Sequence, residues 1–223
     1  MKKNILLFLA TVCLFASESL FAQDNMQVSG ITGNLLKRIV KFGDYTTSKV
    51  KAVKSKTTLS VESIDMEWAK MNYSFTQTSP SASAEVKASA DPNSVEYEQY
   101  RKMLGLSDKG KAVYSGTIAA AQTWAFCVNV VAKPSDDQCG QMIAADGTVI
   151  SITGGDNTKA KDILMNKINF SYNFIFEGDV VGKVTTDDKG QVWIKDGIDS
   201  DMQLALAALS SALLTRIGMS PMD

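Results

Sequence analysis

The chain has 223 residues, with 23 Lys and Arg against 24 Asp and Glu, and it contains no histidine. The absence of histidine excludes Ser-His-Asp and Cys-His catalytic machinery, and also His-ligated zinc, copper or iron sites. The near-neutral charge argues against nucleic acid as the main partner, and the length suits one domain with a proper core.

The first 22 residues have the features of a secretory signal peptide. Two lysines precede the uncharged, mostly apolar run Ile5–Ala16, and Ala22 offers a small residue for cleavage. A membrane span would need about 20 apolar residues, so this run is too short for one. We therefore predict that residues 1–22 are removed and that residues 23–223 act in the periplasm, in the envelope or outside the cell. The alternative is a buried N-terminal helix.

The N-terminal half of the mature chain is predicted to hold short strands and one insertion. The strands are expected near residues 35–42, 48–53, 57–61, 66–68 and 71–76. The segment Gln77–Ala90 is rich in Ser and Ala and contains Pro80, so we expect a surface insertion there. A short helix is expected next, from Asp91 as N-cap to Gly105. Residues 77–105 are thus predicted to be an inserted loop and helix within a single β-rich domain.

The C-terminal half shows clearer strand patterns. Alternating apolar residues predict strands over 114–118, 123–130 and 169–177, and Asp146-Gly147 is a strong hairpin signal. Further strands are expected over 142–144, 148–153, 180–186 and 192–194. Four aromatic residues share one face of the strand over 169–177. We interpret them as core rather than as the lining of a ligand pocket.

The last predicted element, a helix over Met202–Ile217, carries most of the information about the fold. It has no charged residue before Arg216, and its leucines point around much of its circumference, so it must be buried nearly all round. Asp196, Asp199 and Asp201 precede or begin this helix, and we interpret them as capping residues rather than a Ca²⁺ site.

A mainly β fold can enclose such a helix if it closes into a barrel, which also removes exposed strand edges. We therefore predict a closed antiparallel β-barrel of about twelve strands around an apolar C-terminal helix. The alternative is a β-sandwich with the helix packed on one face. A membrane anchor is disfavoured because the helix is short and contains Gln203, Ser210 and Ser211, so we do not expect an integral membrane protein.

The end of the chain also resembles a known superfamily. The run Val180-Val-Gly-Lys-Val184, a turn, Val192-Trp-Ile194 and an Asp-led apolar terminal helix together resemble the end of the tubby-like barrel superfamily, which includes phospholipid scramblases and LURP-one-related proteins. The resemblance covers about the last 50 residues. It implies a twelve-stranded barrel around a C-terminal helix, and it assigns no functional residue.

A cluster of basic residues lies between positions 37 and 56, where Asp44 is the single acid. One interpretation is a patch for an anionic partner such as lipid headgroups or acidic polysaccharide. The other, which we favour, is a solubilising edge strand on which lysines block the addition of another strand. The cluster consists of Lys37, Arg38, Lys41, Lys49, Lys51, Lys54 and Lys56.

The mature chain keeps two cysteines, Cys127 and Cys139. In an oxidising compartment they can form a disulfide, and the alternative is two separate buried thiols. Glu67, beside Trp68, is the one acid that we nominate for a catalytic role. The sequence predicts no metal site and no cofactor.

The leading functional prediction is an exported, non-enzymatic envelope protein that binds a ligand or has a structural role. The first alternative is a carboxylate-dependent hydrolase, which would need convergent carboxylates in a cleft. The second is a peripheral binder of anionic lipid, which would need coplanar lysines flanked by exposed apolar side chains.

Overall fold

The computed structural model describes residues 25–30, 38–61, 64–90, 113–129, 137–156, 169–185 and 190–216. Within these ranges the chain forms strands followed by one helix, α4 (Ser200–Arg216). The strands are β1 (Met26–Gln27), β2 (Lys41–Phe42), β3 (Tyr45–Thr47), β4 (Lys51–Val61), β5 (Ile64–Thr78), β6 (Ser83–Ala90), β7 (Val113–Ala119), β8 (Thr123–Asn129), β9 (Gln138–Ala144), β10 (Val149–Asp156), β11 (Phe170–Phe176), β12 (Asp179–Thr185) and β13 (Gln191–Ile194). The predicted signal peptide and the predicted helix up to Gly105 lie outside the described residues.

Twelve strands form a nearly closed antiparallel barrel. Their order is β1-β13-β12-β11-β10-β9-β8-β7-β6-β5-β3-β2, and β4 pairs with β5 off this path. The two ends of the row meet at one bridge, where the Ser29 N–H donates to the Lys41 carbonyl at 2.9 Å and the Lys41 N–H donates back at 3.0 Å. The predicted barrel of about twelve strands is therefore confirmed, and the sandwich alternative is wrong.

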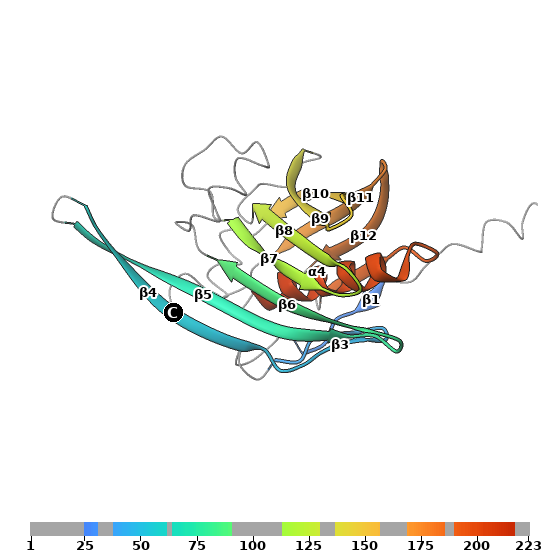
Figure 1. Ribbon diagram of the computed structural model, residues 1–223, viewed down its shortest axis with the longest axis horizontal. Coiled ribbons are helices and arrows are strands. Elements are labelled where there is room, and N and C mark those ends of the chain that lie inside the picture. Colours follow the sequence, from blue (N-terminus) through green and yellow to red (C-terminus); the bar gives the residue numbers. More distant parts are fainter. Residues whose placement is uncertain are drawn as a thin grey trace, which may run out of the picture.

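Helix α4 lies inside this barrel (Figure 1). Every residue from Leu204 to Thr215 is buried, and eleven of these twelve are fully inaccessible to solvent. The inward faces of the strands supply the matching core, including Trp124, Phe126 and Phe174. The aromatic stripe of β11 is thus core, as predicted, with Phe170, Tyr172 and Phe174 buried and Phe176 partly buried.

Asp199 caps the start of α4, as predicted, whereas the carboxylate of Asp201 forms its hydrogen bonds outside the helix. The Asp199 carboxylate accepts hydrogen bonds from the N–H groups of Asp201 and Met202, at 2.9 and 3.1 Å. Asp201 reaches the β7–β8 turn, where it accepts from the Ala121 N–H at 2.7 Å and the Trp124 Nε1–H at 2.9 Å. The helix N-terminus is therefore tied to one end of the barrel.

The predicted insertion at 77–90 is wrong, because β6 (Ser83–Ala90) is a central strand. It pairs with β5 along its whole length and with β7 from Glu85 to Ala90. Although β6 is rich in Ser and Ala, buried and exposed residues alternate along it as in other strands, with Ala84, Val86 and Ala88 buried. Small side chains are needed on this inner face because β6 packs directly against α4.

The N-terminal strands are also longer than predicted. The short strands expected near 48–53, 57–61, 66–68 and 71–76 are parts of one long hairpin, β4–β5. β6 pairs only with residues 71–78 of β5, so the far half of the hairpin projects beyond the barrel as a two-stranded ribbon (Figure 1). Among the described residues β4 pairs with β5 alone, which makes it an edge strand.

Candidate functional site

The described lysines of the basic cluster predicted from the sequence are distributed over β2, the segment before β4, and β4 itself. Lys41, Lys49 and Lys51 are exposed, and Lys54 and Lys56 lie on β4 opposite Met71 and Ala69. Lys37 lies outside the described residues. Because Lys51, Lys54 and Lys56 lie on an edge strand, their position fits the interpretation that lysines protect this edge from strand addition.

The prediction that Arg38 belongs to an exposed basic patch is wrong, because its side chain is buried and only 8% exposed. Its guanidinium Nη1 donates to the carbonyl oxygen of Thr215 at 3.5 Å, at the C-terminal end of α4. A cation is favourable there because the last carbonyls of a helix carry partial negative charge. Burial lowers the pKa of Arg38 from its ordinary value. Arg38 therefore stabilises the internal helix and is not available to an external anion.

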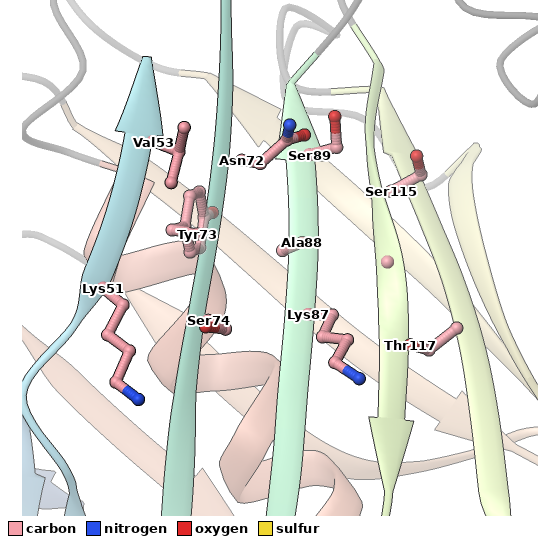
Figure 2. A pocket seen from close by; sticks show the side chains of 11 residues that line it. Lys51, Val53, Asn72, Tyr73, Ser74, Lys87, Ala88, Ser89, Ser115 and Thr117 are labelled. Carbon is pink, nitrogen blue, oxygen red and sulfur yellow. The ribbon is translucent and has the colours of Figure 1, made fainter. Parts of the chain in front are cut away.

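One groove in the described part of the chain gathers polar side chains from four neighbouring strands. It has a volume of about 550 Å³ and lies over β4, β5, β6 and β7. Figure 2 shows Lys51 and Lys87 on one side of it and Asn72, Ser89 and Ser115 on the other. The lining residues are Lys51, Val53, Asn72, Tyr73, Ser74, Lys87, Ala88, Ser89, Ser115, Gly116 and Thr117.

Strand register arranges these side chains in two rows that run across the strands. The first row is Lys51, Ser74, Lys87 and Thr117, which face one another in successive strand pairs. The second row, two residues along each strand, is Val53, Asn72, Ser89 and Ser115. Adjacent strands lie about 4.8 Å apart, so the two lysine backbones are separated by roughly 10 Å. The first row is basic and the second is neutral and rich in hydrogen-bonding groups.

The groove is positively charged because Lys51 and Lys87 line it and no Asp or Glu is among its lining residues. Lys87 forms an ion pair with Glu85, two residues before it on β6, with 3.5 Å between Nζ and Oε1. The pair is well exposed, so it is weak and open to competition from another anion. Lys51 forms no ion pair with any residue that the structure describes.

The strands that form the floor of the groove are held in position by contacts of their inward-facing residues with the barrel core. The ring of Tyr73 is buried, and its hydroxyl donates to the carbonyl oxygen of Ala212 in α4 at 3.3 Å. Gly116 of β7 is needed where it is, because a Cβ there would collide with the carbonyl oxygen of Lys87 and the ring of Phe126. The outward lysines and hydroxyls are therefore mounted on strands that the barrel core holds in place.

Both cysteines are free buried thiols, so the predicted disulfide is not formed. The β8–β9 register places Cys127 opposite Gln141, two residues along β9 from Cys139. Diagonal pairs of this kind lie about 7–8 Å apart, beyond the usual Cα separation of a disulfide. Burial raises the pKa of each thiol to about 12. Neither is a thiolate near neutral pH, and neither can act as a nucleophile there.

Asp44 and Asp196 are acidic residues near Tyr45, where burial raises the pKa of the Tyr45 hydroxyl and their negative charges add to that shift. Within residues 25–216, apart from the undescribed gaps, no group of three acidic or cysteine side chains is arranged to hold a metal ion. The side chain of Glu67 is not among those that the structure describes. In the same part of the chain, no helix is long and apolar enough to cross a membrane.

No known protein family, curated protein or solved structure matches this chain. The groove therefore has to be interpreted from its own chemistry.

Of the polar residues that line the groove, Lys51 alone belongs to the basic cluster predicted from the sequence. Lys87 and Ser89 were assigned to an insertion, so their common outward face was not considered. The signal was present as the alternation of Ala84, Val86 and Ala88 with charged and hydroxyl residues. Partners in the groove on β5 and β7 become visible only when the strands are put in register.

Proposed function

We propose that this protein is an exported, non-enzymatic binding protein of the cell envelope, and that the groove over β4–β7 holds an anionic ligand. The observation that carries the proposal is the row Lys51, Ser74, Lys87 and Thr117, in which two ammonium groups alternate with two hydroxyls. Ammonium groups and hydroxyls together provide charge attraction and directed hydrogen bonds to an anion.

The lining of the groove favours binding over hydrolysis. A carboxylate-dependent hydrolase needs at least two carboxylates around its substrate, and the groove is lined by none. The resemblance to the tubby-like barrel superfamily stays a prediction, and the proposal takes no residue role from it.

A binding titration with a generic soluble polyanion tests this function. Mature protein should bind dextran sulfate at low ionic strength, and binding should weaken strongly as salt is raised. Lys51→Ala and Lys87→Ala should each reduce the affinity, whereas Lys183→Ala, an exposed lysine on β12, serves as the matched control. Equal losses in all three variants would refute the groove as the binding site.

Export is the second part of the proposal, and it rests on the signal-like segment 1–22. Mass spectrometry of the exported protein should find a mature chain that begins near Gln23. An intact Met1 on the exported chain would contradict signal cleavage.

A further inference from the structure

We infer that the ligand of the groove is an extended acidic polysaccharide that lies across strands β4 to β7. This inference rests on the proposed function and names its substrate class. It is carried by the two-row arrangement of the groove, by its length across four strands and by the side chains that surround it.

The basic row suits a polymer with regularly repeated negative charges. Lys51 and Lys87 are separated by one strand, which places their backbones roughly 10 Å apart along the row. In Figure 2 both side chains extend in the same direction from the sheet. Two cations on one line engage two carboxylates of one chain more strongly than they engage two separate small anions, because the second contact is then intramolecular.

The neutral row suits the hydroxyl groups of sugars. Asn72, Ser89 and Ser115 present an amide and two hydroxyls, which can both donate and accept hydrogen bonds. Val53 ends this row and is 64% exposed, so it offers apolar contact to the C–H face of a sugar ring. A free inorganic anion would leave this second row without a partner.

The described side chains around the groove favour a polysaccharide over a membrane surface as the ligand. Membrane binding by a basic patch is strengthened by apolar side chains that enter the lipid. Among the side chains that the structure describes, which do not include those of residues 54–71, the large exposed apolar residues other than Val53 are Val149 on β10 and Val180 on β12. Neither of them lines the groove. A polysaccharide needs no such insertion.

Glu85 should weaken ligand binding, because its carboxylate competes with the ligand for the ammonium group of Lys87. Its carboxylate lies 3.5 Å from the Lys87 Nζ and would be displaced when a uronate carboxylate binds. Glu85→Gln removes this competitor with little change in shape. Affinity for an acidic polysaccharide should therefore rise about two- to fivefold, the range of an exposed ion pair.

The experiment measures binding of mature protein to polygalacturonate fragments of increasing length, with fully methyl-esterified fragments as the neutral control. We expect affinity to rise steeply once a fragment spans both lysines, and to be lost on esterification. Lys51→Ala and Lys87→Ala should each cost about five- to tenfold and should remove the length dependence. Lys183→Ala should leave the affinity unchanged.

Each other outcome overturns a defined part of the inference. Tighter binding to vesicles containing anionic lipid than to polygalacturonate would assign the groove to membranes. Binding to polyphosphate, a polyanion without sugar, but to neither polygalacturonate nor dextran sulfate would refute the polysaccharide while leaving the proposed function intact. Binding that does not depend on fragment length would do the same. Failure to bind any polyanion would refute both proposals.

Discussion

The inner and outer faces of strands β5, β6 and β7 have opposite surroundings. On the inner face Tyr73, Val86 and Tyr114 are buried against α4. On the outer face their immediate neighbours Ser74, Lys87 and Ser115 line an open groove. The same stretch of backbone thus carries a close-packed core on one side and a polar groove on the other.

This difference predicts that folding stability and the proposed binding depend on separate sets of residues. Changes on the inner face should alter folding, because a packed core cannot adapt to a lost side chain. Changes on the outer face should alter binding and leave folding nearly intact. The following predictions test that separation, from the largest expected effect to the smallest.

Removal of α4 should have the largest effect. A chain that ends at Asp199 lacks the helix whose residues Leu204 to Thr215 are all buried, so the apolar lining of the barrel would face water. We expect no cooperative unfolding transition in circular dichroism or denaturant melts. A truncated protein that stays folded and soluble would show that the helix is not needed by the barrel.

Replacing one buried leucine of α4 by alanine should destabilise the fold strongly, but less than removing the whole helix. Leu206, Leu209 and Leu213 are fully buried, and Leu→Ala at such sites typically costs about 2–5 kcal/mol. Denaturant melts should show losses of that size in the free energy of unfolding. Gln203→Ala, at a half-buried position of the same helix, is the control and should change stability far less. Equal effects in all four variants would argue against close packing around the helix.

Loss of the Asp201 carboxylate should have an intermediate effect. It accepts the Trp124 indole N–H and the Ala121 backbone N–H, so Asp201→Ala leaves both donors without this partner. We expect a loss of about 1–3 kcal/mol in the free energy of unfolding. Near-ultraviolet circular dichroism and tryptophan emission should change as well, and an unchanged tryptophan signal would contradict the contact with Trp124.

The two cysteines predict a dependence of stability on pH. Burial raises the pKa of both thiols from an ordinary value near 9 to about 12. Below pH 9 both folded and unfolded states keep these protons. Between about pH 9 and 12 the unfolded state loses them first, so stability falls as pH rises. The double variant Cys127→Ala and Cys139→Ala should show a shallower fall in the free energy of unfolding between about pH 9 and 11 than wild type.

Thiol labelling checks the same feature directly. Protein without residues 1–22, which lacks Cys13, should react slowly with a thiol reagent at pH 8 when native. The same protein should take up two labels when denatured without reduction. Fewer than two labels after denaturation would show that the cysteines are paired.

The smallest effect on stability is expected on the outer face. Lys51→Ala and Lys87→Ala should each change the free energy of unfolding by less than about 0.5 kcal/mol, because the side chains are exposed. The same variants should weaken polyanion binding severalfold. A large loss of stability in either one would show that the two faces are not separate in function.

The amino-acid sequence by itself determined the C-terminal half of the fold. The alternation in β8 and β11, the Asp146-Gly147 turn and the Asp199 cap are local signals, and each predicted its element within a few residues. The all-round apolar surface of α4 also determined the barrel, because only an enclosing sheet can bury such a helix. These inferences needed no knowledge of which strands are neighbours.

Only the tertiary structure decided the central position of β6, the role of Arg38 and the composition of the groove. Small residues in β6 resemble a loop until α4 is seen to lie against them. Arg38 and Thr215 are far apart in the sequence, and their contact follows from threading the helix through the barrel. The groove exists because register aligns single residues from four strands, and register depends on pairing that no local pattern specifies.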